Sequence, residues 1–200
     1  MEQIRSFIAI ELPDELKQAL TRLRDQLKSG KQAPAKWVDP YSIHLTLKFL
    51  GNISPDMAGK ITMALEEAVR EVAPFRLEAK GLGAFPGLKR VRVVWVGITG
   101  EIDRLRRLQQ RIESGLSKLG FVPESRPFTP HLTLARLSDR ATPDERQSLG
   151  QLIASTSFET VCTIDVGSIN LMKSQLTREG AIYTLISSVK LEEPRAGSGK

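Results

Sequence analysis

The sequence predicts an α+β protein in which a β-α-β-α-β unit occurs twice. The two units are expected to form lobes with antiparallel-rich sheets, related by a pseudo-two-fold axis around a central cleft. The chain contains two histidines, and both begin the tetrapeptide His-Leu-Thr-Leu, at residues 44–47 and 131–134. The offset between the copies is 131 − 44 = 87 residues. The elements expected around the first tetrapeptide recur around the second at nearly this offset, which indicates an internal duplication.

Each copy opens with a strand that is followed by an amphipathic helix. Residues 4–12 and 91–98 are rich in β-branched residues and bounded by turn or helix signals, as expected of strands. The segment after each strand shows the 3.6-residue apolar period of a helix. Its apolar stripe consists of Leu16, Leu20, Leu23 and Leu27 in the first copy and of Ile102, Leu105, Leu108, Ile112 and Leu116 in the second.

A second helix is predicted after each tetrapeptide. Residues 54–56 are Ser-Pro-Asp and residues 142–144 are Thr-Pro-Asp. Each triplet combines an N-cap residue, a proline at the first helical position and an acid in the first turn. The pattern does not determine the order of the strands within the sheets. Further strands, the last two forming a hairpin, are predicted at 75–82, 158–166, 168–176 and 181–189.

The composition favours an anionic partner and an intracellular location. The net charge of +6 and the pI near 9.6 point to nucleic acid as the partner. A single cysteine, Cys162, excludes an intramolecular disulfide, and neither a signal peptide nor an apolar run of bilayer length occurs. We therefore expect a cytoplasmic monomer with no membrane partner. One bilobal domain should span residues 1–191, with a disordered tail over 192–200.

The tetrapeptides place histidine and threonine on one face of each strand, because side chains alternate between the two faces. In the first copy this alternation puts His44, Thr46 and Lys48 on the face opposite the leucines. In the second copy His131 and Thr133 share the corresponding face. A pseudo-two-fold axis would bring both faces to one cleft.

Two imidazoles and two hydroxyls on one surface suit in-line displacement at phosphorus. One imidazole can take a proton from an attacking water while the other gives a proton to the leaving oxygen. Histidine suits both tasks, since its unperturbed pKa of about 6.5 lets either form be populated near neutrality. The hydroxyls of Thr46 and Thr133 can donate to the non-bridging phosphoryl oxygens. A duplicated packing tetrapeptide is the structural alternative, but alternation aims these side chains away from the leucine core.

The motifs do not predict a metal or cofactor site. Each His-x-Thr supplies one good ligand, whereas a mononuclear catalytic metal typically has about three protein ligands. The acids nearest the motifs, Asp39 and Asp139, are isolated, and neither HExxH nor a Walker-type phosphate loop occurs. We therefore expect catalysis that needs neither a metal nor a cofactor.

With these residues assembled, the chain resembles the two-histidine (HxTx) phosphoesterase superfamily. Within it, the chain is similar to the bacterial and archaeal RNA 2′,3′-cyclic phosphodiesterases of the 2′-5′ RNA ligase family. The resemblance extends over residues 1–190 and is carried by RSFIAIELP (5–13), Trp37, HLTLKFLG (44–51), VRVVWVGI (91–98), RPFTPHLTLAR (126–136), Ser174, Gly180 and Tyr183.

The resemblance implies a substrate and a role for each motif residue. The substrate would be RNA, tRNA included, or a nucleotide that ends in a 2′,3′-cyclic phosphate. Opening the bond to the 3′-oxygen would leave a 2′-phosphomonoester without help from a metal. His44 would donate the proton to the leaving 3′-oxygen, His131 would accept the proton of water, and Thr46 and Thr133 would bind the phosphate. The donor and acceptor roles rest on the family, because the two motifs are identical in sequence.

Five residues near the motifs are candidates for further substrate contacts. Arg126 and Arg136 could contact phosphate, Trp37 and Phe49 could stack on a base, and Lys48 could add positive charge. Simple alternation puts Arg136 on the leucine face unless a β-bulge intervenes, and it favours core packing for Phe49. Solvated surface positions are the alternative for the charged residues.

The sequence leaves two other functions open. The same site could run the reverse reaction and join a 5′-hydroxyl to a cyclic phosphate, as a 2′-5′ RNA ligase. It could also hold an RNA end without turnover, with the histidines serving only as phosphate ligands.

Overall fold

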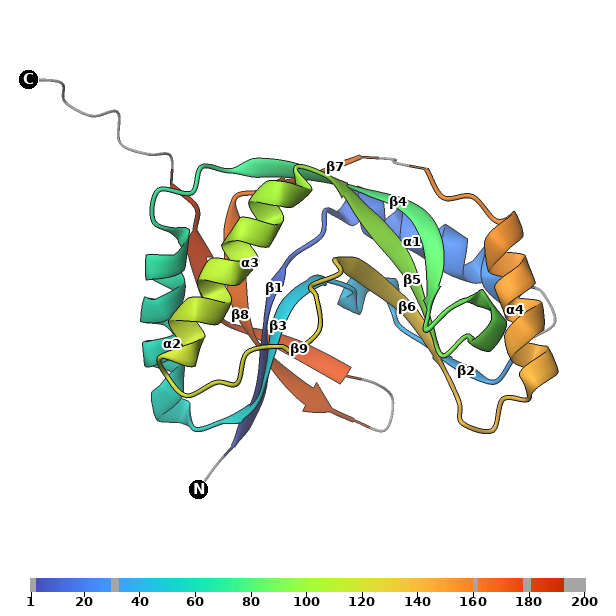
Figure 1. The fold of residues 1–200 in the computed structure, drawn as a ribbon, viewed down its shortest axis with the longest axis horizontal. Helices are drawn as coiled ribbons and strands as arrows, with labels where there is room; N and C mark the ends of the chain where they lie inside the picture. Colours follow the sequence, from blue (N-terminus) through green and yellow to red (C-terminus); the bar gives the residue numbers. More distant parts are fainter. Residues whose placement is uncertain (1–2, 30–32, 160–161, 178–180, 193–200) are drawn as a thin grey trace, which may run out of the picture.

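The computed structural model describes residues 3–29, 33–159, 162–177 and 181–192, which form two antiparallel sheets flanked by helices (Figure 1). The predicted α+β class is confirmed. The tail predicted as disordered lies outside the described residues from position 193 on, as does the hairpin turn at 178–180. Within the described ranges, no helix is both long enough and apolar enough to cross a membrane.

Sheet A contains four strands and sheet B contains five, and all neighbouring strands are antiparallel. In order across sheet A these are β3 (Leu45–Ile53), β1 (Ile4–Ile10), β8 (Ser168–Leu176) and β9 (Ala181–Lys190). Across sheet B they are β2 (Ala35–Trp37), β6 (His131–Leu137), β5 (Val93–Gly100), β4 (Phe75–Phe85) and β7 (Thr163–Val166). The helices are α1 (Asp14–Lys28), α2 (Pro55–Val69), α3 (Ile102–Ser117) and α4 (Pro143–Ser155).

The two halves of the chain exchange elements between the sheets. The pair β1–β3 of the first half corresponds to the pair β5–β6 of the second. However, β4 from the first half pairs with β5, and β8 from the second half pairs with β1. The helices are exchanged as well, because α3 packs with α2 beside sheet A while α1 lies with α4 beside sheet B (Figure 1). Each lobe is therefore built from both halves of the chain.

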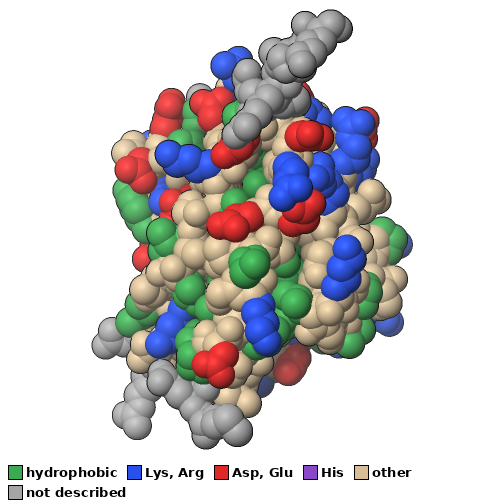
Figure 2. Space-filling model, turned by 90° about the vertical axis from the view of Figure 1, so that its left-hand side faces the viewer, with side chains coloured by type: hydrophobic (Ala, Val, Ile, Leu, Met, Phe, Trp, Pro, Cys, Tyr) green, Lys and Arg blue, Asp and Glu red, His purple; other side chains and the backbone are tan. Residues whose placement is uncertain are grey.

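The helices cover one face of each sheet, which we call the outer face, and leave the other, the inner face, to the motifs. The leucine stripe predicted for the first helix is buried, and so are four of the five residues predicted for the third, with Ile102 half-buried. The predicted starts of α2 and α4 at proline are confirmed, and α4 has a complete capping box between Thr142 and Glu145. Figure 2, which looks onto the side that carries α2, shows acidic and basic side chains interspersed. The positive net charge is not gathered on that side.

A β-bulge occurs at the same place in both motif strands. In β3 Leu47 is an extra residue against β1, and in β6 the corresponding extra residue against β5 is Leu134. These positions correspond at the offset of 134 − 47 = 87. The strand β3 has a second register shift against β1 at Leu50. A bulge reverses the alternation of the side chains that follow it, as far as the next register shift. The faces predicted for residues before the bulge therefore hold, and those predicted after it do not.

Candidate active site

His44 lies directly before β3, at the end of a short 3₁₀ turn (Pro40–Ser42). Its imidazole stacks on the ring of Phe7, with centroids 4.4 Å apart and planes inclined by 17°. The ring of Tyr183 meets it edge-on at 4.9 Å. A hydrogen bond with the backbone of Ser42 completes its surroundings. His44 is thus held on the inner face of sheet A by two aromatic rings and its own backbone.

His131 is the first residue of β6 and is held in a similar way on sheet B. The ring of Phe85 meets it edge-on at 5.0 Å, and the indole of Trp95 lies 6.4 Å away. Its Nδ1 lies 2.7 Å from the carbonyl oxygen of Thr129. A carbonyl only accepts, so Nδ1 carries the proton and Nε2 is left to exchange protons with a ligand.

The contact between histidine and the preceding backbone is repeated in the two copies. Ser42 and Thr129 each precede their histidine by two residues and correspond at the offset of 129 − 42 = 87. The duplication has therefore kept the backbone acceptor as well as the imidazole. This hydrogen bond fixes the tautomer of the imidazole, which a tetrapeptide that serves only for packing would not need.

Gly83 lets the indole of Trp95 pack closely against β4 near His131. A Cβ added to Gly83 would clash with the six-membered ring of Trp95. The indole therefore rests directly on the backbone of sheet B. Its position fixes one wall around His131.

The pKa of His44 is lowered to about 4, chiefly by burial; the hydrogen bond to Ser42 acts to raise the pKa, and the positive charge of Lys17 acts to lower it. The cause is that the Phe7 and Tyr183 rings replace water around the imidazole and so disfavour its charged form. In the free protein His44 is therefore neutral at pH 7.

A buried neutral histidine makes the stability of the fold depend on pH. The folded protein holds the pKa of His44 at about 4, whereas the unfolded value is 6.5. Between these values the unfolded chain binds the extra proton, so the contribution to stability is present above pH 6.5 and is lost as the pH falls toward 4. We expect this group to lower the free energy of unfolding by about 2 kcal/mol between pH 7 and pH 5. Urea unfolding of the wild type and of His44→Gln at both pH values isolates the effect. An equal loss in both proteins would contradict it.

Thr46 and Thr133 lie on the inner faces, two residues beyond their histidines. Thr46 is opposite Ala9 of β1, and Thr133 is opposite Trp95 of β5. Both side chains are half-buried, and neither hydroxyl has a hydrogen-bond partner within the described ranges. Both hydroxyls are therefore available to a ligand.

The strands that carry the two motifs lie next to each other. The strands β3 and β6 contact each other, although they belong to different sheets. Burial raises the pKa of Tyr183, and the positive charges of Arg5 and Arg136 act against this rise. Arg136 belongs to the second motif strand, and Tyr183 touches the histidine of the first. We refer to His44, Thr46, His131 and Thr133 together as the two-histidine surface.

Lys48 does not lie on this surface, so the prediction that it shares the face of His44 is wrong. Because the bulge at Leu47 precedes it, its side chain points to the outer face and is 3% exposed. Its Nζ donates to Glu113 Oε2 at 2.8 Å and to the carbonyl oxygen of Val122 at 3.0 Å. Lys48 therefore joins β3 to α3 and to the segment that leads to the second motif.

The same bulges bring Phe49 and Arg136 to the inner faces. Phe49 is 62% exposed, and its ring lies 6.3 Å from that of Phe7, so the prediction that core packing is favoured is wrong. Arg136 is exposed and lies opposite Val93, on the inner face that it shares with Thr133. The bulge on which its inclusion depended is present in β6.

The other two candidates occupy different positions. Trp37 pairs with Ala135, which is fully buried on the outer face, and cross-strand partners share a face. Trp37 accordingly packs against the main core and is not part of the two-histidine surface. The reason is that β2 pairs with the part of β6 that follows the bulge at Leu134. Arg126 is exposed in the segment between α3 and β6.

Several residues around the histidines were not selected from the sequence. Phe7 and Trp95 lie within the predicted strands at 4–12 and 91–98. Alternation along each strand places them on the face opposite the core, so both could have been identified from the sequence. Phe85 and Tyr183 reach the histidines through the pairs β4–β5 and β1–β8, which join the two halves of the chain; Tyr183 lies on β9, next to β8. No three His, Cys, Asp or Glu side chains within the described part of the chain are grouped so that they could hold a metal ion.

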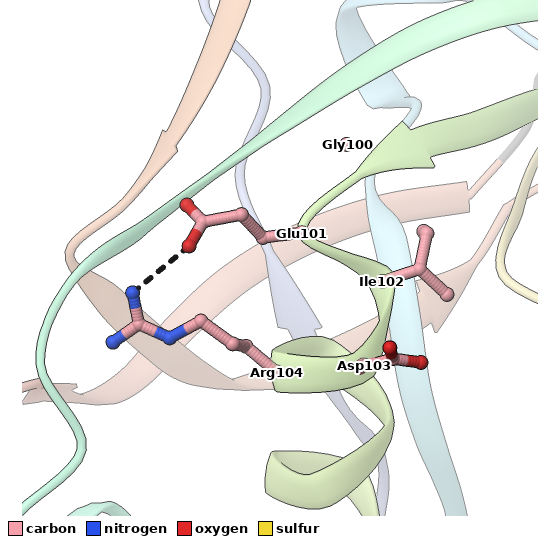
Figure 3. A pocket seen from close by; sticks show the side chains of 5 residues that line it. All are labelled: Gly100, Glu101, Ile102, Asp103 and Arg104. Carbon is pink, nitrogen blue, oxygen red and sulfur yellow. Dashed lines mark hydrogen bonds and ion pairs between the residues drawn. The ribbon is translucent and has the colours of Figure 1, made fainter.

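A surface hollow of about 260 Å³ at the start of α3 is a separate feature. It is lined by residues 100–104 and includes none of the two-histidine surface. Figure 3 shows Glu101 and Arg104 turned toward each other, with Oε1 and Nη1 3.0 Å apart. The other carboxylate oxygen accepts from the backbone N–H of Arg76 at 2.6 Å. The carboxylate is therefore already engaged in fixing the turn between β5 and α3.

Comparison with known proteins places the chain in a family. A sequence profile of the 2′-5′ RNA ligase superfamily matches residues 12–178. The protein named RNA 2′,3′-cyclic phosphodiesterase from Aeropyrum pernix is 40% identical over 172 residues, which cover 86% of this chain and 94% of that protein. The protein of the same name from Methanothermobacter thermautotrophicus is 34% identical over 182 residues, covering 91% and 96%.

Solved structures share the fold over nearly all of this chain. E. coli LigT in complex with 3′-AMP has a TM-score of 0.74 and 26% identity, covering 96% of this chain and 100% of LigT. A protein from Thermus thermophilus has a TM-score of 0.75 and 27% identity, covering 95% and 99%. The resemblance carried by the two tetrapeptides is confirmed. The chain belongs to the 2′-5′ RNA ligase superfamily.

Proposed function

We propose that this chain hydrolyses the 2′,3′-cyclic phosphate at the end of an RNA to a 2′-phosphomonoester, with His44 and His131 as a metal-independent acid–base pair. One observation carries the proposal. Each histidine is hydrogen-bonded to the backbone two residues earlier and is followed two residues later by a half-buried threonine without a partner in the described part of the chain. The curated relatives named RNA 2′,3′-cyclic phosphodiesterase support the same activity.

The reaction exchanges one phosphorus–oxygen bond for another. Water attacks phosphorus in line with the bond to the 3′-oxygen, and His131 takes a proton from the water through Nε2. The bond to the 3′-oxygen breaks, and His44 supplies the proton that this oxygen needs. Water and the cyclic diester thus become a 2′-phosphomonoester and a 3′-hydroxyl. Two proton transfers of this kind contribute about 10²–10⁴-fold each.

The donor role of His44 requires its protonation when the substrate is bound. In the free protein burial holds its pKa at about 4. A phosphate anion beside the imidazole stabilises the imidazolium and raises the pKa. Protonation of the donor is thereby coupled to the arrival of the substrate.

The remaining residues position the substrate. The hydroxyls of Thr46 and Thr133 donate to the non-bridging oxygens, where negative charge accumulates in the transition state. The exposed ring of Phe49 offers a stacking surface for the terminal base. Arg136, on the inner face with Thr133, contacts the phosphate backbone, and Arg126 is retained as a second candidate for this role.

The direct test is turnover of adenosine 2′,3′-cyclic phosphate by the purified protein in excess chelator. We expect conversion to adenosine 2′-phosphate, separated from the 3′ isomer by chromatography. Absence of turnover would refute the proposed activity. Turnover only after a divalent metal is added would refute the metal-independent mechanism.

The family description favours ligation as a second candidate function. A 5′-hydroxyl that takes the place of water would attack the same phosphorus, with His131 again taking the proton of the attacking hydroxyl and His44 again giving a proton to the leaving 3′-oxygen. Incubating an RNA that ends in a cyclic phosphate with one that begins with a 5′-hydroxyl tests this. A joined 2′-5′ product supports ligation, whereas hydrolysed ends alone support the hydrolase. Binding with no turnover of either kind would identify an RNA-end binding protein.

A further inference from the structure

Lys36 of β2 lies directly opposite Arg136 of β6 in the antiparallel register. Both side chains are exposed, and cross-strand partners point to the same face of a sheet. This face is the inner one, because Arg136 is also opposite Val93, next to the pair formed by Thr133 and Trp95. Two cations are therefore side by side at the edge of the two-histidine surface.

This pair is unfavourable for the fold unless an anion is present. Like charges directly opposite on neighbouring strands destabilise a sheet. Neither Lys36 nor Arg136 forms an ion pair or a side-chain hydrogen bond within the described ranges. By contrast, the exposed Arg76 of the same sheet has a carboxylate partner, Asp165. The two cations are thus available to an external anion.

The pair also makes the pseudo-symmetric surface unequal. Arg136 and Phe49 correspond at the offset of 136 − 49 = 87, and both follow a bulge onto an inner face. At this position sheet A presents an aromatic ring beside Phe7, and sheet B presents a cation beside Lys36. The aromatic position suits the base of a nucleotide, and the cationic position suits a phosphate.

The distance along β6 matches a neighbouring phosphate. Arg136 follows Thr133 by three residues, of which one is bulged, so about two strand steps or roughly 7 Å separate them. If Thr133 holds the cyclic phosphate, an anion at Arg136 lies one nucleotide unit away. That anion is the phosphate on the 5′ side of the terminal nucleoside.

We propose that Lys36 and Arg136 bind the first internucleotide phosphate before the cyclic end, so that the site prefers an oligonucleotide end to a mononucleotide. This inference rests on the proposed function. Arg136 can grip the phosphodiester with two parallel N–H donors, and Lys36 adds a point charge from the next strand. Lys36 is thereby a specificity-determining residue that sequence inspection had not selected.

The test compares two dinucleotides that both end in a 2′,3′-cyclic phosphate. One has a natural phosphodiester linkage and the other an uncharged methylphosphonate linkage. For the wild type we expect kcat/KM to be about 10-fold higher with the charged linkage, the effect of a charge-assisted contact at a partly exposed site. In Lys36→Met this preference should shrink to about 2–3-fold, with Arg136 supplying the remainder. Lys60→Met, which removes an exposed lysine from α2, should keep the full preference.

Equal kcat/KM for the two linkages in the wild type would overturn the inference, as would a full preference in Lys36→Met. Adenosine 2′,3′-cyclic phosphate, which has no internucleotide linkage, separates this failure from failure of the proposed function. If the wild type turns over the mononucleotide without a linkage preference, only the phosphate subsite is refuted. If it turns over neither kind of substrate, the proposed activity itself is refuted.

Discussion

Replacing either histidine with asparagine is expected to lower kcat for a cyclic phosphate by about 10²–10⁴-fold, because each variant loses one of the two proton transfers. The pH profile of the residual activity distinguishes the roles. His131→Asn should lose the acidic limb of a bell-shaped profile, since no neutral imidazole is then required as the acceptor. His44→Asn should lose the basic limb, since no imidazolium is then required as the donor.

The control for these variants is the stability of the fold. His44 packs between Phe7 and Tyr183, so its replacement can affect folding as well as chemistry. Tyr183→Phe keeps the edge-on ring and removes only the hydroxyl, and it should retain most of the activity. Urea unfolding at pH 7 should show that both histidine variants are folded under assay conditions. A folded histidine variant with more than about a tenth of wild-type kcat would contradict the acid–base pairing.

Removing the charge of Lys48 is expected to lower the free energy of unfolding by about 3–5 kcal/mol, because Glu113 would then be left as an uncompensated buried charge. The side chains of Lys48 and Glu113 are only 3% and 14% exposed, and their charged atoms lie 2.8 Å apart. Urea unfolding of Lys48→Met measures the loss. The double variant Lys48→Met/Glu113→Leu removes both charges and should recover most of it.

An exposed ion pair of similar length provides the matched control. Lys80 and Glu159 are 2.9 Å apart, but their side chains are 52% and 70% exposed. Lys80→Met should therefore lower the free energy of unfolding far less than Lys48→Met does. If Lys48→Met and Lys80→Met cost the same, the buried pair does not hold β3 to α3 as the structure indicates.

The motif residues could be predicted because they precede the bulges. Up to Leu47 and Leu134 the period of two is regular, so His44, Thr46, His131 and Thr133 were assigned to the correct faces. The next buried leucines are three residues further on, Leu50 and Leu137, in both copies. The change in the spacing of the buried leucines from two residues to three indicates the bulge. Lys48 and Phe49 were assigned to the wrong faces because the prediction assumed a spacing of two throughout.

Other features could not be read from periodicity because they depend on strand pairing. A local pattern specifies which side of a strand is apolar, but it does not specify the neighbouring strand. The pairs β4–β5 and β1–β8 connect the halves of the chain, and they bring Phe85 to His131 and Tyr183 into the same sheet as His44. Lys36 could not be identified for the same reason. The strand β2 is only three residues long, and the position of Lys36 beside Arg136 follows from the pairing of β2 with β6.

The exchange of β4 and β8 between the two halves of the chain determines how the protein unfolds. A polypeptide cut between the two repeats would leave each fragment with strands whose hydrogen-bonding partners reside on the other fragment. Neither repeat is thus a self-sufficient folding unit, even though the gene product is built from two similar ones. The lobes are expected to unfold in a single concerted transition, and the two-histidine surface exists only while both are folded.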